Sequence, residues 1–226
     1  MEPASQAERF RDLTIETFVD RLASAAPVPG GGSASAIAAS LGAALVSMVA
    51  ALSEGREKYA AHAATLSEAG AVGRDLASRF LVLADDDAAA YAAFGAALKM
   101  ARRTDEETAA RAEAIRGAAR TAAEVPMACV EACLELAAAA EALAGRSNRN
   151  ASSDLSVASL LAEAAARGAA ANVMVNLSAI GDESYAGVMT ARVVGLLREI
   201  ESLGLETRET VLKGTEREPL PPRDAG

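Results

Sequence analysis

Residues 27–52, PVPGGGSASAIAASLGAALVSMVAAL, combine a glycine-rich turn with a long uncharged segment and are the most informative part of the chain. Gly30, Gly31 and Gly32 lose much conformational entropy on folding, and such a run is useful where the backbone must approach another group closely. Ser33 is a good N-cap, and the residues after it favour a helix. The stretch therefore predicts a bare backbone at a helix N-terminus, where unpaired N–H groups and the helix dipole suit an anion or an oxyanion. A tight turn that only starts a buried helix is the alternative.

The helix predicted after this turn carries no charged residue from Ala34 to Leu52. It is long enough to span a bilayer, so a membrane helix is one interpretation. However, most of its residues are Ala, Ser and Gly, which gain little from contact with lipid. A helix that is apolar all round is also typical of the centre of a large bundle. We interpret it as the buried central helix of a soluble protein and expect no membrane association.

The composition is that of an all-α protein. Hydrophobic residues make up 51% of the 226 residues and aromatic residues only 3%, and alanine, the best helix former, supplies most of the apolar content. Runs of β-branched residues that are typical of strands are absent. Because no linker-like stretch divides the chain, we expect one domain over residues 1–226, with its core at about 13–203 and a loose tail at 208–226.

Charge and cysteine content exclude several classes of protein. The net charge is −9 and no basic cluster is present, whereas nucleic acids and anionic membranes require one. Residues 1–6 lack the basic and apolar segments of a signal peptide, which predicts a cytoplasmic protein. Cys129, Cys133 and the single histidine, His62, make a poor zinc set, so we expect buried reduced thiols, no metal and no cofactor.

Helix-forming segments separated by turn residues predict a multihelical bundle. The expected helices span about 14–25, 35–52, 57–102, 104–144, 154–180 and 183–202. Their expected caps are Thr14, Thr104, Asp182 and either Ser152 or Ser153. We expect Gly70 and Gly73 to interrupt the third helix, and Pro126 to kink the fourth and free a carbonyl group one turn earlier.

One helix carries a carboxylate where an apolar residue is expected. Phe80, Leu83, Tyr91 and Phe94 recur at steps of three and four and form an apolar stripe. Asp87 stands in that stripe between Leu83 and Tyr91. A buried carboxylate is costly unless it is paired or functional, and burial raises its pKa and makes it a candidate proton carrier. A water-filled seam between helices or an arginine partner is the alternative explanation.

Further polar residues are candidates for ligand binding. Asn172 and Asn176 lie four residues apart on an Ala-rich helix, and such amides either hold a ligand or tie two helices together. Asp154 lies in the first turn of that helix, where the dipole alone favours it. Arg56 and Lys58 follow the central helix, and they are either solvated or bind a ligand carboxylate.

An ordered set of short motifs runs along the chain: Pro29-Gly30-Gly31-Gly32-Ser33 with Met48, Gly55-Arg56-x-Lys58-Tyr59, Asp87-x-x-x-Tyr91, Val125-Pro126, Asn148…Ser153-Asp154-Leu155, and Asn172-Val173…Asn176-Leu177…Asp182. Taken in order, these motifs resemble the cyclodeaminase/cyclohydrolase family, which comprises the C-terminal domain of formiminotransferase-cyclodeaminase and the free-standing bacterial methenyltetrahydrofolate cyclohydrolases. The resemblance covers about residues 13–203, and the ordered set is much more specific than the glycine motif alone. The sequence departs from many relatives at Ser147-Asn148, where they have Gly-Asn.

The resemblance implies a multihelical homodimer with a folate site, and it places the family's catalytic aspartate on Asp87. We expect hydrolysis of 5,10-methenyltetrahydrofolate to 10-formyltetrahydrofolate, with Asp87 as general base and proton donor, because no formiminotransferase domain is attached. The alternatives are a formimidoyltetrahydrofolate cyclodeaminase and a non-catalytic folate-binding or scaffold dimer. The expected substrate-binding residues are Gly30, Gly31, Gly32, Ser33, Arg56, Lys58, Asn148, Asp154, Asn172 and Asn176.

Overall fold

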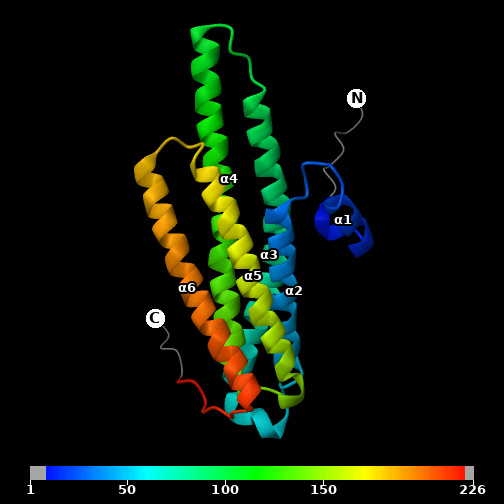
Figure 1. The fold of residues 1–226 in the computed structure, drawn as a ribbon. Coiled ribbons are helices and arrows are strands. Elements are labelled where there is room, and N and C mark those ends of the chain that lie inside the picture. Colours follow the sequence, from blue (N-terminus) through cyan, green and yellow to red (C-terminus); the bar gives the residue numbers. More distant parts are fainter. Residues whose placement is uncertain (1–8, 222–226) are drawn as a thin grey trace.

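The computed structural model describes residues 9–221, and this part of the chain is helical with no strand, as the composition predicts. The helices α2 to α6 run alternately up and down a bundle, and α1 lies to one side (Figure 1). Residues 1–6, which we inspected for a signal peptide, lie outside the described residues. The elements are η1 (Phe10–Asp12), α1 (Ile15–Leu22), α2 (Gly31–Ala51), η2 (Glu57–His62), α3 (Ala63–Leu98), α4 (Asp105–Leu143), η3 (Arg149–Ala151), α5 (Ser152–Leu177) and α6 (Glu183–Lys213), where η marks a 3₁₀-helix.

The uncharged helix α2 packs against α3, α5 and α4. It is not buried all round as the sequence predicts, because Leu41 is 57% and Met48 38% exposed. Its side chains Ala39, Ala43, Val46 and Val49 are fully buried and belong to the main hydrophobic core. By length and composition α2 is a candidate membrane span, but 44% of its most apolar 18-residue stretch is already buried inside the protein. The remainder of α2 leaves an apolar face exposed.

The prediction that Gly70 and Gly73 interrupt the third helix is wrong, because α3 is continuous from Ala63 to Leu98. Gly73 serves packing instead. A Cβ atom at this position would lie 2.8 Å from the carbonyl oxygen of Ala43 and 2.8 Å from the backbone nitrogen of Ser47. The absence of a side chain therefore lets α3 approach the backbone of α2 closely, which a sequence pattern does not reveal.

Three of the predicted caps are confirmed and two are wrong. The side chains of Thr14, Thr104 and Asp182 accept hydrogen bonds from backbone N–H groups in the first turns of α1, α4 and α6. Gly30, not Ser33, is the N-cap of α2, so Gly31 and Gly32 already belong to the helix. The N-cap of α5 is Ala151 and not Ser152 or Ser153, because η3 leads directly into that helix.

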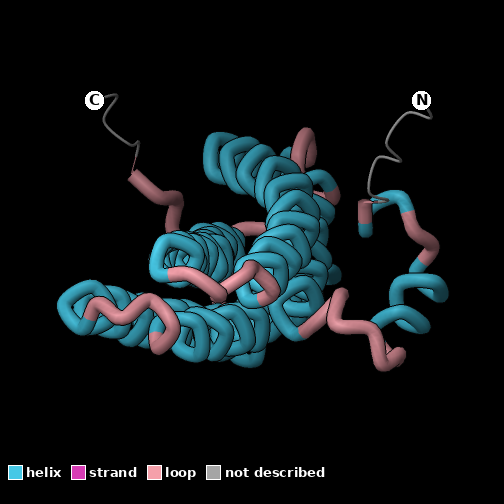
Figure 2. The backbone as a smooth tube through the Cα atoms, turned by 90° about the horizontal axis from the view of Figure 1, so that it is seen from above, coloured by secondary structure: helices cyan, strands magenta, loops and turns pink. Residues whose placement is uncertain are grey.

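The C-terminal part of the chain is more ordered than the sequence predicts. We expected the last helix to end near residue 202 and the tail to be loose from residue 208, but α6 continues to Lys213 and ends at Gly214, which adopts a left-handed conformation (φ 60°). The buried residues Ile200, Gly204 and Thr207 continue the helical period and explain this extension. The segment after α6 and the helix α1 lie on opposite sides of the bundle (Figure 2). The last part of the tail, residues 222–226, lies outside the described residues.

Candidate active site

The carboxylate of Asp87 lies against the first turn of α2. Asp87 belongs to α3 and is half-buried, as its place in the apolar stripe predicts. The hydroxyl oxygen of Ser33 lies 2.9 Å from Asp87 Oδ2 and 3.1 Å from the carbonyl oxygen of Ala84, so its proton is shared between two acceptors on α3. Ser33 itself is completely buried. The motif at residues 30–33 and the aspartate, which are far apart in the sequence, therefore meet in the folded chain.

Burial raises the pKa of Asp87 above its usual value of 3.8, because desolvation disfavours the ionised form. Hydrogen bonds from the Ser33 hydroxyl and the Ser33 backbone N–H act in the opposite direction and stabilise the anion, but they only partly offset the burial. A carboxylate with a raised pKa, held at a helix N-terminus, can accept a proton and return it at less acidic pH than an exposed aspartate.

Among the three glycines, Gly32 is the one whose missing side chain leaves room for the carboxylate of Asp87. A Cβ atom at Gly32 would lie 2.1 Å from Asp87 Oδ1 and 2.5 Å from Asp87 Cγ, far inside normal contact distance. At Gly31 the nearest neighbour of such an atom would be Asn172 Nδ2, at 3.8 Å, which is an ordinary contact. The sequence predicts that the glycine backbone approaches another group closely. In the structure this happens at Gly32, and the other group is the carboxylate of Asp87.

Two predicted binding residues on α5, Asn172 and Asn176, lie near this end of α2. Asn172 donates a hydrogen bond from Nδ2 to the carbonyl oxygen of Gly168 (2.9 Å), and its Oδ1 accepts none from any residue in the range 9–221. Asn176 donates from Nδ2 to the carbonyl oxygen of Ala122 on α4 (2.7 Å). That carbonyl is the group that Pro126 leaves without an intrahelical partner, since proline has no N–H. Asn176 thus ties α5 to α4 at the place where the sequence predicts a free carbonyl.

The remaining predicted binding residues lie at the other end of α2. Asn148 is buried there: its backbone N–H donates to Ser53 Oγ (2.8 Å), and its Oδ1 accepts from the N–H of Asn150 (3.1 Å). Lys58 and Arg56 flank the start of η2, and Asp154 lies in the first turn of α5. Because α2 has 21 residues, its two ends are about 30 Å apart. In the single chain the predicted binding residues therefore form two groups, one at each end of α2.

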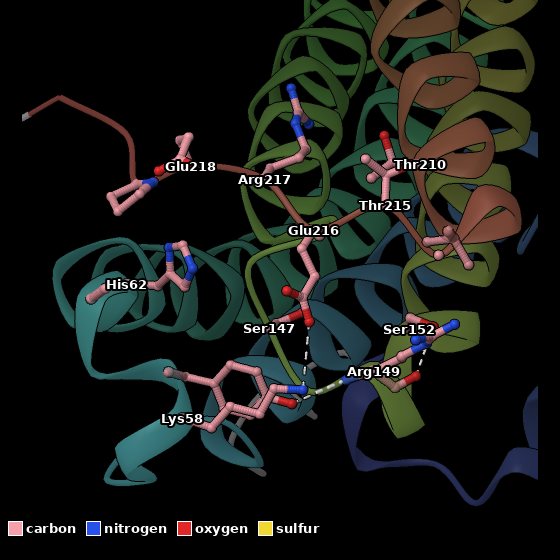
Figure 3. Close-up of a pocket in the computed structure, with 16 residues that line it drawn as sticks. Lys58, His62, Ser147, Arg149, Ser152, Thr210, Thr215, Glu216, Arg217 and Glu218 are labelled. Atoms are coloured by element: carbon pink, nitrogen blue, oxygen red, sulfur yellow. Dashed lines mark hydrogen bonds and ion pairs between the residues drawn. The ribbon is translucent and has the colours of Figure 1, made fainter.

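A cavity of about 290 Å³ lies beside Lys58 and includes residues that the sequence analysis missed (Figure 3). Arg149, Thr210 and Glu216 line it, and Thr210 and Glu216 belong to residues 208–226, for which the sequence predicts a loose tail. The continuation of the apolar period beyond residue 202 was the available signal that the chain stays packed here. The two cysteines are free and buried, as expected, and within residues 9–221 no three His, Cys, Asp or Glu side chains are grouped as metal ligands.

The described residues thus form a helical bundle in which a half-buried aspartate of α3 lies against the N-terminus of α2. The chain belongs to the formiminotransferase-cyclodeaminase family, whose sequence model matches residues 14–194. This confirms the resemblance seen in the sequence motifs. The family assignment also accounts for a bundle without strands in residues 9–221.

Individual relatives fall into two groups. A methenyltetrahydrofolate cyclohydrolase of Methylorubrum extorquens is 43% identical over 198 residues, covering 88% of this chain and 95% of that protein. The formimidoyltransferase-cyclodeaminase of Sus scrofa is 33% identical over 188 residues, but this chain matches only 35% of its length. The crystal structure of the formiminotetrahydrofolate cyclodeaminase of Thermotoga maritima superposes with a TM-score of 0.81 at 25% identity, covering 90% of this chain and 98% of that one.

Proposed function

We propose that this protein hydrolyses 5,10-methenyltetrahydrofolate to 10-formyltetrahydrofolate, with Asp87 as the acid–base group. The observation that carries the proposal is the half-buried carboxylate of Asp87, held by Ser33 at the N-terminus of α2. The 43% identity to a methenyltetrahydrofolate cyclohydrolase, which extends over nearly the whole of both chains, supports this substrate. We further propose a cytoplasmic enzyme that needs no metal or other cofactor.

In the proposed mechanism Asp87 takes one proton from water and later gives it to N5. The carboxylate of Asp87 removes a proton from water as the water oxygen bonds to the cationic methenyl carbon between N5 and N10. The tetrahedral carbon that forms carries a hydroxyl group. Its C–N5 bond then breaks, the carboxyl group of Asp87 returns its proton to N5, and loss of the hydroxyl proton leaves a formyl group on N10. Proton transfer by a positioned side chain contributes about 10²- to 10⁴-fold to the rate.

The environment of Asp87 suits both halves of this cycle. The ionised form attracts the cationic methenyl group, and the hydrogen bonds from Ser33 hold the carboxylate in one orientation. The raised pKa brings the basicity of the carboxylate closer to what proton transfer at neutral pH requires. The backbone of Gly30, Gly31 and Gly32 and the Oδ1 of Asn172, which accepts no hydrogen bond within residues 9–221, are then available to contact the pterin and aminobenzoyl groups.

We propose that a homodimer completes the site, since the two groups of binding residues lie at opposite ends of α2. Large apolar side chains are exposed on both α2 and α5: Leu41 is 57% and Leu160 52% accessible, and Met48 and Val157 are also exposed. Such exposed apolar side chains mark an interaction surface. A twofold axis through the middle of α2 would bring the Asp87 end of one subunit to the Lys58 end of its partner, as an isologous dimer requires.

A cyclodeaminase that releases ammonia from formimidoyltetrahydrofolate is the second candidate. The superposition on the Thermotoga maritima cyclodeaminase and the match to the Sus scrofa protein favour it. Both reactions need a proton carrier at the same one-carbon unit, so Asp87 would serve in either. A non-catalytic folate-binding dimer would retain the fold and bind folate without turnover.

The test is to incubate the purified protein with each substrate. Loss of the methenyltetrahydrofolate absorbance is expected, whereas release of ammonia from formimidoyltetrahydrofolate would establish the cyclodeaminase instead. Asp87→Asn should lower kcat at least about a hundredfold and leave the circular dichroism spectrum unchanged. Turnover of neither substrate by the wild-type protein would refute the enzymatic proposal.

The same preparation tests the shared site. Asp87→Asn chains are expected to have a low kcat and Lys58→Ala chains a high KM, whereas mixing them by unfolding and refolding should restore activity at low substrate concentration. A mixed dimer would contain one site with both native residues. Failure of the mixture to exceed its two components would contradict a site that is shared between subunits.

A further inference from the structure

The cavity beside Lys58 is enclosed by the segment that follows α6, residues 214–219 (Figure 3). Its other walls are η2 and the loop at residues 145–152 between α4 and α5. At about 290 Å³ it lies at the lower end of ligand-pocket volumes, so it suits a small ligand or one part of a larger one. Lys58, His62, Arg149, Thr210 and Glu216 contribute polar groups to its lining.

The enclosing segment is held in place by specific contacts. The backbone N–H of Arg217 donates to the carbonyl oxygen of Gly145 (3.0 Å), and its guanidinium group pairs with Glu141 and with Glu206 (2.8 Å). Arg146, which is 6% exposed, donates from Nε to the carbonyl oxygen of Glu218 (2.6 Å). The segment is therefore a fixed wall of the cavity, and Arg217 is already neutralised by its two partners.

The other basic groups of the cavity are incompletely compensated. Lys58 Nζ lies 3.6 Å from Glu216 Oε1, and both side chains are largely exposed, so the pair is weak. The guanidinium group of Arg149 forms no ion pair with any residue from 9 to 221, and it lies against Gly214 at the edge of the cavity. His62 Nδ1 is buried without a hydrogen-bond partner in that same range. In a chain of net charge −9, this cavity thus has one cation without an ion pair in the described residues, one weakly paired cation and one buried ring nitrogen without a hydrogen-bond partner there.

The carboxylate of Glu216 indicates which ligand chemistry fits these donors. It comes from the enclosing segment and points to Lys58 across the cavity (Figure 3). The carboxylate of Glu216 thus already lies in the cavity, but it pairs with Lys58 and not with Arg149. A guanidinium group binds a carboxylate with two parallel hydrogen bonds, which Glu216 does not form with Arg149.

We propose that this cavity takes a carboxylate-bearing ligand between Arg149 and Lys58, and that Glu216 is a tethered competitor that the ligand displaces. Two sources offer this chemistry. One is the glutamate tail of a folate whose pterin lies at Asp87 of the partner subunit, and this source rests on the proposed function. The other is a free dicarboxylate, which does not depend on it.

Calorimetric titration of the full chain with tri-γ-glutamate and, separately, with glutarate tests the site directly. Binding of at least one of the two probes is expected. Arg149→Gln should weaken it about tenfold or more, because a charge-assisted hydrogen-bond pair is lost. Glu216→Gln should tighten it about two- to fivefold, because an exposed competing ion pair is removed. Arg192→Gln is the matched control. It removes a surface ion pair between Arg192 on α6 and Glu131 on α4 and should leave the binding of both probes unchanged.

Kinetics distinguish the two sources. If the tail of the folate is the ligand, the KM for a triglutamyl substrate is lower than that for the monoglutamyl form, and Arg149→Gln abolishes this difference without changing kcat. Equal KM values together with glutarate binding assign the site to a free dicarboxylate. The proposal is overturned if neither probe binds the wild-type protein at millimolar concentration, or if Arg149→Gln and Glu216→Gln leave binding unchanged. Absence of folate turnover would refute the proposed function and leave the calorimetric result intact.

Discussion

Adding one methyl group at Gly32 should separate the catalytic geometry of this protein from its stability. In Gly32→Ala the new Cβ atom would lie 2.1 Å from Asp87 Oδ1. Ordinary contacts between non-bonded heavy atoms are about 3.5 Å or longer, so the carboxylate must move by more than about 1 Å. Because the carboxylate is the end of a side chain, it can rotate away from α2, and the backbone can stay in place.

The size of the two effects follows from these contacts. Loss of the hydrogen bond from Ser33 to an ionised carboxylate destabilises the protein by about 1.5–3 kcal/mol. The higher helix propensity of alanine offsets up to about 1 kcal/mol of this. We therefore expect a net destabilisation of about 0.5–2 kcal/mol, which the protein should survive. A displacement of 1 Å in a catalytic group lowers the rate by about a hundredfold, so activity should fall much more than stability.

The assay compares kcat for methenyltetrahydrofolate hydrolysis with the free energy of unfolding in urea. Gly195→Ala on α6 is the matched control, because a Cβ atom there has no neighbour within 4 Å. It should stabilise the protein by about 0.5–1 kcal/mol and leave kcat unchanged. Gly32→Ala with wild-type kcat would refute the idea that the carboxylate must lie against the first turn of α2.

Three further predictions concern protonation, helix packing and assembly. Since burial raises the pKa of Asp87, the folded state favours the protonated form; this contribution to stability is complete below pH 3.8 and is lost as the pH rises through the folded-state pKa. Asp87→Asn should therefore melt at a higher temperature than the wild type at pH 7. The kcat/KM of the wild type should fall as the pH is lowered, with a midpoint above pH 3.8. A lower melting temperature of the variant, or a kinetic midpoint below pH 3.8, would contradict this. Asn176→Ala should lower the free energy of unfolding in urea by about 1–3 kcal/mol, because the Ala122 carbonyl loses its partner. The loss should be clearly smaller in a Pro126→Ala background. Equal losses in both backgrounds would show that Asn176 and Pro126 are not coupled. Leu41→Arg should convert a dimer into an inactive monomer by light scattering and assay, and an active dimer of this variant would exclude the exposed α2 face as the interface.

Much of the fold could be read from local signals. The alanine content and the caps Thr14, Thr104 and Asp182 predicted the helices and several of their starts, because these depend on neighbouring residues only. Asp87 stood out for the same reason, since a carboxylate in a helical apolar stripe is visible in a short window. Gly73, in contrast, looks like a helix breaker in the sequence, and its close contact with α2 depends on a residue thirty positions away.

Local sequence patterns predict that this chain forms a helical bundle and single out Asp87 and the glycine triplet. Packing between the helices places Gly32 and Ser33 against that aspartate and Asn176 against the carbonyl group that Pro126 leaves free. It also places the binding residues at the far end of α2 about 30 Å away. The two kinds of information differ in range. Helix propensity, capping and periodicity act over a few residues, whereas the position of one helix end relative to another follows from packing across the whole bundle.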